Sequence, residues 1–292
     1  MDILAQLEPA LGQASGEAVP LEGGITNRNF RARLGGEDYV IRRHGKDTSV
    51  LGIDRAAERL ASEAAAGLGI APQVVASFAD GLVTRFIDCA PIDPGGVAER
   101  AGEIALALRA FHQSGVQLPA RFWVPDLLEE YARIVVRGGR VLPPAYAETV
   151  AVARRIAAAV PLDVLRPCHN DLLPGNIIRA LDGGGTMIVD WEYAGMGHPY
   201  FDLGNLSVNN DFGEHDDERL LEAYHDVPPT DAKRAQLKLM RVLSDAREAA
   251  WGVVQAGISE LDFDFAGYGQ RHFDRLLRAV AGPELEEWLA SA

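Results

Sequence analysis

The chain has 292 residues, 48% hydrophobic and 24% charged, a composition typical of a folded protein large enough for two lobes. Its formal net charge of −14 argues against a nucleic-acid partner, because phosphate backbones bind basic surfaces. The acidic first residues do not resemble a signal peptide, and no apolar stretch reaches the ~18 residues that span a bilayer. With only Cys89 and Cys168 there is no disulfide framework, so we expect a cytoplasmic protein, monomeric or homodimeric, without a membrane partner.

After an initial helix, the first part of the chain carries strand patterns. Residues 29–34 alternate apolar and polar side chains, and so do residues 38–43. Gly35 and Gly36 lie between them. Two glycines between alternating segments predict a β-hairpin.

Next comes a helix and then two further strands. Residues 54–69 are rich in Ala, Leu and Glu with apolar residues at helical spacing, and Gly67 and Gly69 are expected to end this helix. Residues 72–78 and 81–87 are predicted to be strands joined by a turn.

The pattern becomes helical after the segment PIDPGG, residues 91–96. We therefore predict a nucleotide-binding lobe over residues 1–90 and a catalytic and substrate-binding lobe over residues 91–292. The helices expected in the second lobe span residues 97–112, 126–136, 145–159, 232–255 and 267–280.

Two short segments carry the chemistry, CHNDLLPGN at residues 168–176 and IVDWE at residues 188–192. The spacing of Asp171 and Asn176 is that of the kinase catalytic loop, D-x-x-x-x-N. Asp190 follows an apolar strand, where a second metal-binding aspartate would lie. Phosphoryl transfer from ATP needs such a base and such magnesium ligands. His169 is expected to order the loop rather than to accept the proton.

The segment LEGGITNRNF, residues 21–30, is a candidate phosphate loop. Gly23 and Gly24 allow close approach of the backbone to phosphates, and Thr26 and Asn27 could add hydrogen bonds. A purely structural Gly-Gly turn is the alternative.

On the following strand, Arg42 is a candidate for contacting the α- and β-phosphates, in the place where protein kinases use a lysine. Arg43 points to the opposite face, since side chains alternate along a strand. Glu58, on the next helix, is expected to pair with Arg42, and Glu63 is its competitor.

Three aromatic residues could line a substrate site: Tyr193, Trp251 and Tyr268. A quaternary ammonium has no N–H donor, so aromatic faces and a carboxylate must hold it. A role in the hydrophobic core is the alternative for Trp251.

At these residues the chain resembles the choline/ethanolamine kinases, within the aminoglycoside phosphotransferase-like superfamily. The resemblance covers nearly the whole chain. It is carried by GGITNRNF, YVIRRHG, HNDLLPGN, VDWEYAGMGHPYFDLGN and the segment WGVVQAGISELDFDFAGYGQRHFD. It implies an α+β, two-lobed protein-kinase-like fold with a small antiparallel-sheet N-lobe and a larger, mainly helical C-lobe.

The resemblance also implies ATP and Mg²⁺ as cofactors and a small cationic alcohol, foremost choline, as substrate. Adenine would meet the connecting strand near Arg85 and Ile87. Asp171 would activate the substrate hydroxyl, and Asn176 and Asp190 would hold magnesium.

Glu192, Tyr193, Trp251 and Tyr268 would face the substrate in such a kinase. The chain departs from the eukaryotic members one helical turn before Trp251, where Glu248 replaces a second Trp. Alternative substrates are ethanolamine, an aminoglycoside, thiamine or a sugar. A non-catalytic nucleotide-binding scaffold is a further alternative.

Overall fold

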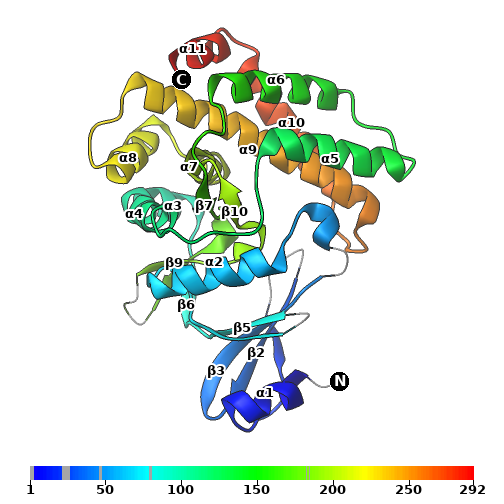
Figure 1. Cartoon of the computed structure of the whole chain (residues 1–292), viewed down its shortest axis with the longest axis vertical. Coiled ribbons are helices and arrows are strands. Elements are labelled where there is room, and N and C mark those ends of the chain that lie inside the picture. The colour runs from blue at the N-terminus through cyan, green and yellow to red at the C-terminus, as the bar shows by residue number, and fades with distance from the viewer. Residues whose placement is uncertain (1–2, 22–26, 46–47, 79–80, 182, 184) are drawn as a thin grey trace.

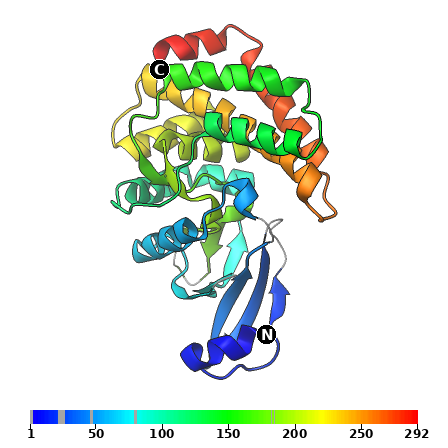
Figure 2. The same cartoon turned by 45° about the vertical axis from the view of Figure 1, so that its right-hand side comes forward.

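The computed structural model describes residues 3–21, 27–45, 48–78, 81–181, 183 and 185–292. A β-sheet lies at one end of the molecule and most of the helices gather at the other, with one helix between them (Figure 1). A view turned by 45° shows the same division (Figure 2). This is the predicted α+β architecture with an antiparallel-sheet N-terminal part and a mainly helical remainder.

The N-terminal sheet has five antiparallel strands in the order β1-β2-β3-β5-β4. They span Val19–Leu21 (β1), Arg28–Leu34 (β2), Glu37–Arg43 (β3), Val74–Phe78 (β4) and Gly81–Arg85 (β5). The β2–β3 hairpin is confirmed. Gly35 and Gly36 turn it with φ of 58° and 90°, values that L side chains rarely adopt.

A small core belongs to this sheet. Helix α1 (Ile3–Leu11) contributes Leu7, which is buried with Leu34, Ile41 and Val83 from the strands. Because side chains alternate along β3, Ile41 faces this core while the neighbouring Arg42 faces the other way. The hairpin therefore directs Arg42 toward the rest of the molecule.

Helix α2 (Arg55–Gly67) confirms the predicted helix over residues 54–69. Asp54 begins it by accepting the N–H groups of Ala56 and Ala57 at 2.8 and 3.0 Å. Its fully buried Ala57, Ala61 and Ala65 belong to the large core that the C-terminal helices build. Helix α2 therefore packs against the helical end of the molecule and connects the sheet end to it.

Three of the predicted C-terminal helices are confirmed with shifted ends and a fourth, α6, with the same ends. They are α5 (Val124–Arg137), α6 (Ala145–Ala159), α9 (Asp231–Ile258) and α10 (Phe265–Val280). The patterns did not predict α7 (Pro199–Asn209), α8 (Glu214–His225) or α11 (Glu284–Ser291). No helix within the described ranges is long and apolar enough to cross a membrane.

The prediction of a single helix over residues 97–112 is wrong. This part of the chain forms two helices, α3 (Pro94–Glu99) and α4 (Ala101–His112). Asp93 caps a helix that begins at Pro94, and the N–H of Arg100 bonds to the carbonyl of Val97, three residues back, which closes that helix. Val97 and Ala101, on either side of the break, are both fully buried.

Two small sheets carry the motif loops. One has the order β6-β8-β9, with Cys89–Pro91 (β6), Ile177–Ala180 (β8) and Thr186–Ile188 (β9). The other pairs Arg166–Cys168 (β7) with Gly195–Gly197 (β10). Strand β6 begins just before the predicted lobe boundary at residue 90 and pairs with β8. The boundary itself stays a prediction.

Helix α9 runs through the centre of the helical part, between α5, α7 and α10 (Figure 1). Gly204 on α7 makes the contact with α9 possible, because a Cβ there would come 2.6 Å from the backbone of Met240. This close approach sets α9 directly behind the loop that carries Asp171.

Candidate active site

The loop after β7 is held from behind by a buried carboxylate. Asp202 on α7 accepts the backbone N–H groups of His169 and Asn170 at 2.8 and 2.7 Å. Its Oδ2 also lies 2.9 Å from Nε2 of His112. Asn170 has a φ of 69°, which turns the chain sharply just before Asp171. Asp202 therefore positions the loop and does not line the site.

His169 orders the same loop. Its Nε2 lies 3.0 Å from the carbonyl oxygen of Val189, and its ring meets Trp191 edge-on at 4.6 Å. Burial lowers the pKa of His169, so the ring is neutral near pH 7. Cys168 is fully buried, and burial raises the pKa of its thiol. Both findings agree with structural roles for these two residues.

The three motif residues Asp171, Asn176 and Asp190 come together at the β8–β9 hairpin. The side-chain amide of Asn176 donates to the Asp171 carbonyl at 2.7 Å and to Asp171 Oδ2 at 3.2 Å. Ile177 pairs with Ile188, and the N–H of Val189 bonds to the Asn176 carbonyl. This register brings Asn176 beside Asp190, which has a φ of 66°.

A second group of charges, which we call the lobe-crossing cluster, comprises Arg42, Arg55, Glu58, Asp190 and Glu192. Arg42 Nη1 lies 2.5 Å from Asp190 Oδ1 and 3.3 Å from Glu58 Oε1. The expected pairing of Arg42 with Glu58 is therefore present. The competitor Glu63 pairs instead with Arg59 on the exposed side of α2.

Arg55 was not recognised from the sequence. Its Nη1 lies 2.8 Å from Glu58 and 3.2 Å from Glu192 Oε2, so it ties α2 to the segment after Asp190. Its position three residues before Glu58 on a helix was the only available signal. Burial opposes ionisation of Glu58, but the neighbouring His44, Arg42 and Arg55 side chains lower the pKa of Glu58 to about 2.

Asn27 is the candidate phosphate-loop residue that the structure describes. Its side-chain amide donates to Glu192 Oε2 at 2.9 Å. Gly24 and Thr26 lie outside the described residues. Burial raises the pKa of Glu192 to about 7, Asp190 reinforces the shift, and Arg42 opposes it. Glu192 therefore faces Asn27 and Arg55 at the junction of the two ends of the molecule.

A third group, the α9 cluster, comprises Asp171, Arg247, Glu248 and Tyr268. Arg247 Nη1 lies 3.0 Å from Asp171 Oδ1 and 2.6 Å from Glu248 Oε1, and the Tyr268 hydroxyl donates to Glu248 Oε2 at 2.7 Å. Burial raises the pKa of Asp171 to about 8, Arg247 opposes the shift, and Glu248 reinforces it. Arg247 was missed from sequence, although an Arg-Glu pair within the apolar run of a long helix is a signal of a buried polar group.

The predicted aromatic residues do lie together. Trp251 Nε1 donates to the Tyr193 hydroxyl at 2.8 Å, and the Trp251 ring meets Tyr268 edge-on at 5.6 Å. Trp251 is only 4% exposed, so it packs in the core and borders the α9 cluster at the same time.

Arg85 is the last residue of β5, and Ile87 lies on the segment that connects β5 with β6. The Arg85 side chain bonds to Glu37 at 2.9 Å and to Gln73 at 3.2 Å, on the exposed side of the sheet. A contact with adenine at this segment would therefore use the backbone, as expected from the resemblance, and it stays a prediction.

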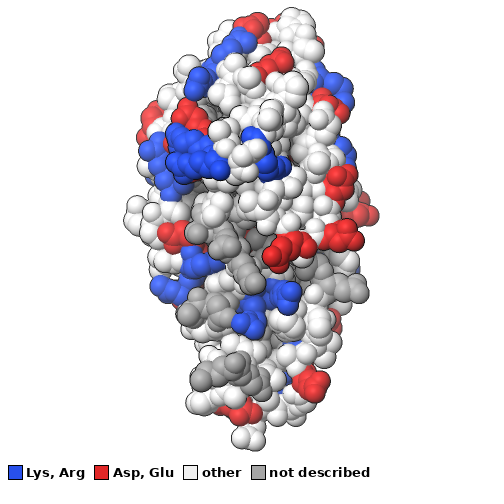
Figure 3. Space-filling model, turned by 90° about the vertical axis from the view of Figure 1, so that its right-hand side faces the viewer, with Lys and Arg blue, Asp and Glu red and all other residues white. Residues whose placement is uncertain are grey.

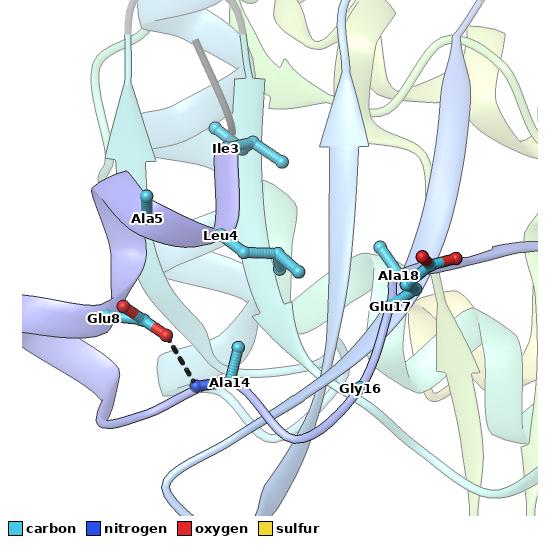
Figure 4. A pocket seen from close by; sticks show the side chains of 8 residues that line it. All are labelled: Ile3, Leu4, Ala5, Glu8, Ala14, Gly16, Glu17 and Ala18. Carbon is cyan, nitrogen blue, oxygen red and sulfur yellow. Dashed lines mark hydrogen bonds between the residues drawn. The ribbon is translucent and has the colours of Figure 1, made fainter.

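Two surface features do not compete with this site. A pocket at the sheet end is lined by α1 and the following loop, where Glu8 accepts from the N–H of Ala14 at 3.0 Å (Figure 4). It contains no cluster of catalytic side chains. On one face of the molecule, basic and acidic side chains are interspersed (Figure 3). The negative net charge therefore forms no single-sign surface on that face.

The chain is similar to known proteins over most of its length. Residues 17–240 match the model of the phosphotransferase enzyme family. Ethanolamine kinase 1 from Mus musculus is 25% identical over 299 residues, covering 87% of this chain and 81% of that protein. A solved structure of LicA in complex with AMP is 25% identical with a TM-score of 0.75, covering 96% of each chain.

A choline/ethanolamine kinase family protein from Mesorhizobium loti is 31% identical, with a TM-score of 0.80 over 95% of this chain and 92% of that one. The matched region contains the Asp171 loop, the Asp190 segment and the candidate phosphate loop. The chain is a kinase that belongs to the phosphotransferase enzyme family and, within it, to the choline/ethanolamine kinases.

Proposed function

We propose that this kinase transfers the γ-phosphoryl group of ATP, in a Mg²⁺-dependent reaction, to the hydroxyl of a small amino alcohol. The observation that supports this most is the joining of Asp171, Asn176 and Asp190 by one loop and one hairpin. These are the base and the two metal ligands that phosphoryl transfer requires.

In this reaction Asp171 accepts the proton of the substrate hydroxyl. The oxygen forms a bond to the γ-phosphorus while the bond to the ADP oxygen breaks. The Asn176 amide, bonded to Asp171 Oδ2 at 3.2 Å, orients the base. Arg42, set between Asp190 and Glu58, is placed to contact nucleotide phosphates, and Asn27 marks the described edge of the phosphate loop.

The side chains at the β8–β9 hairpin fit a magnesium ion. The Asn176 N–H₂ group is used by Asp171, which leaves its amide oxygen as a ligand, and the Asp190 side chain is 20% exposed. Oxygen ligands of this kind suit Mg²⁺. The ion would neutralise charge on the phosphates of ATP. We propose Asn176 and Asp190 as its protein ligands.

Choline and ethanolamine are the two first candidates for the alcohol. Tyr193, Trp251 and Tyr268 supply aromatic surface, and Glu192, next to Tyr193 in the chain, supplies a carboxylate where the two ends of the molecule meet. Glu248 replaces the second aromatic wall expected for choline, so the aromatic enclosure is reduced. This supports ethanolamine, whose ammonium donates hydrogen bonds, over a trimethylammonium group.

The test is ADP release with Mg²⁺ and a panel of choline, ethanolamine, thiamine, an aminoglycoside and a sugar. Turnover of an amino alcohol with the highest kcat/KM supports the proposal. Preference for thiamine, an aminoglycoside or a sugar would replace the substrate class but keep the chemistry.

Measurements of nucleotide binding distinguish a catalytic kinase from a non-catalytic scaffold. We expect ATP to bind more tightly with Mg²⁺ than without it, and the difference to disappear in Asp190→Ala. Magnesium-independent binding together with no turnover of any alcohol would support a scaffold.

Two further expectations stay with this proposal. The two cysteines form no disulfide, which is compatible with the reducing cytoplasm that we propose as its location. Gel filtration with light scattering would distinguish between the two expected states, a monomer and a homodimer.

A further inference from the structure

The backbone that follows Asp171 is held by two side-chain amides. The N–H group of Leu172 donates to Oδ1 of Asn205 on α7, and the Leu172 carbonyl oxygen accepts from Nδ2 of Asn210, directly after α7, at 3.1 Å. Both side chains are buried, as is Leu172 itself. Buried main-chain groups need protein partners. These two residues, which we call the α7 amide pair, therefore fix the two successive peptide groups after the base.

Each amide has one orientation that satisfies its partners. Asn205 Nδ2 donates to Ser244 Oγ on α9 at 2.9 Å, which leaves the Asn205 oxygen to accept from Leu172. A flipped Asn205 would set its N–H₂ group against the Leu172 N–H group, donor against donor. Asn210 Nδ2 donates to the carbonyl oxygens of both Leu172 and Leu206. The α7 amide pair is therefore held in one arrangement, and Ser244 supports it from a second helix.

The other contacts of the base leave this part of the loop to the α7 amide pair. Asp202 accepts the N–H groups of the two residues before Asp171, and Arg247 bonds to its carboxylate. The peptide group between Asp171 and Leu172 is held at its carbonyl by Asn176 and at its N–H by Asn205. Rotation of this peptide would turn the carboxylate, and a misplacement of about 1 Å can lower the rate ~10²-fold.

We propose that Asn205, supported by Ser244, and Asn210 are positioning residues that aim the Asp171 carboxylate at the hydroxyl of the acceptor. They act through the backbone of Leu172 and do not touch the reacting atoms. This inference rests on the proposed function, in which Asp171 is the base, and adds the residues that hold that base from its C-terminal side.

Substitution of either amide should slow the transfer without weakening binding. We expect kcat to fall about tenfold to a hundredfold in Asn205→Ala and in Asn210→Ala, with KM for ATP and for the alcohol within about threefold of the parent. Ser244→Ala, which removes only the bond behind Asn205, should lower kcat less. If the unpaired N–H of Leu172 prevents Asn205→Ala from folding, Asn210→Ala and Ser244→Ala carry the test.

A double variant shows whether the pair acts through the base. Adding Asn210→Ala to Asp171→Asn should lower the residual kcat by less than about threefold, because a side chain without base function gains nothing from being aimed. A further loss of about tenfold or more would mean that Asn210 acts on the rate by another route, and would overturn the inference.

Ser207→Ala is the matched control on the same helix. Ser207 is fully buried but donates to Asp217 on α8 instead of to the loop. Its loss should lower Tm by a few degrees, as the loss of Asn210 should, while kcat stays within about threefold of the parent. An equal fall of kcat in Ser207→Ala would show that the stability of α7, and not the aim of the base, sets the rate.

Failure of the inference is distinguishable from failure of the proposed function. A parent enzyme that phosphorylates an alcohol, with kcat within about threefold in both Asn205→Ala and Asn210→Ala, would overturn the inference and leave the proposed function standing. A parent that phosphorylates no alcohol with Mg²⁺ and ATP would refute the proposed function and the inference with it.

Discussion

The lobe-crossing cluster and the α9 cluster meet at the same site but differ in how they are held. In the first, Arg42, Arg55 and Asp190 keep side chains that are 15%, 22% and 20% exposed, and the contacts cross from the sheet end to the helical end. In the second, Arg247 and Glu248 are 2% and 1% exposed and are adjacent on one helix. We propose that the partly exposed side chains of the first cluster exchange protein partners for a nucleotide and metal, whereas Arg247 and Glu248 in the second stay fixed in the core.

This difference in burial predicts that substitutions in the two clusters have different effects. Ion pairs that retain some solvent contact can be rearranged at modest cost, but a buried pair that loses one partner is strongly destabilised. We therefore expect substitutions in the lobe-crossing cluster to change nucleotide use. Substitutions in the α9 cluster should change the choice of acceptor and the stability of the fold.

The largest effect should come from Asp171→Asn, where the two clusters meet. The amide cannot accept the hydroxyl proton, so kcat should fall by ~10²–10⁴-fold, while ATP binding, measured by titration, is retained. Activity within tenfold of the parent would show that Asp171 is not the base. Loss of ATP binding as well would mean that the carboxylate also holds the nucleotide.

Lowering the pH should destabilise the fold in two steps, of which the first involves His198. His198 accepts the N–H of Tyr200 and so caps α7, which carries Asp202, and burial lowers the pKa of His198 to about 4 from 6.5, against attraction from Asp163. The unfolded chain then binds a proton that the folded chain does not, so stability falls as the pH drops from 6.5 toward 4. The loss amounts to at most about 3 kcal/mol.

Glu58 responds at lower pH. Its lowered pKa, about 2 against 4.5, makes its contribution decline only as the pH falls from 4.5 toward 2. Urea unfolding at several pH values should show that the free energy of unfolding of the parent falls between pH 6.5 and 4. The fall should be smaller in His198→Asn, whose side chain keeps an acceptor that can cap α7. An identical pH profile for parent and variant would show that His198 does not cause the loss.

Glu58→Gln should affect the nucleotide and spare the acceptor. Arg42 loses one of the two carboxylates that aim it, so KM for ATP should rise about tenfold with little change in KM for the alcohol. Steady-state kinetics with each substrate varied in turn measures this. Glu63→Gln is the control, since Glu63 pairs with Arg59 on the exposed side. Equal effects of the two variants would contradict the assignment.

The smallest effect is expected for Trp251→Phe. The ring packing is largely kept, but the Tyr193 hydroxyl loses its 2.8 Å donor, which should cost about 1 kcal/mol and lower Tm by a few degrees. KM for the alcohol should change more than KM for ATP. Trp288→Phe on α11 is the matched control, and the same kinetic change in both variants would assign Trp251 to the core alone.

Local patterns predicted individual elements of the fold and the catalytic-loop motif. The β2–β3 hairpin follows from alternation around Gly35 and Gly36, and Asp171 and Asn176 are recognisable because only four residues separate them. The roles of these residues stay predictions, but the placement that those roles need is present.

Contacts between distant segments were beyond the same patterns. Arg55 meets Glu192 across 137 positions, and Asp171 meets Arg247 across 76. Neither pair has a periodic signal, because both depend on how α2 and α9 pack against the loops. The break at Arg100 was missed for a related reason, since the apolar spacing continues through it while the backbone hydrogen bonds do not.

Helix α9 has a consequence for how such kinases can diversify. Arg247, Glu248 and Trp251 lie within two turns of one continuous helix, whereas the loop that carries Asp171 is held at His169 and Asn170 by Asp202 from another helix. A duplicated gene could therefore acquire a new acceptor through neighbouring codons on α9, with the loop that performs the transfer inherited unchanged.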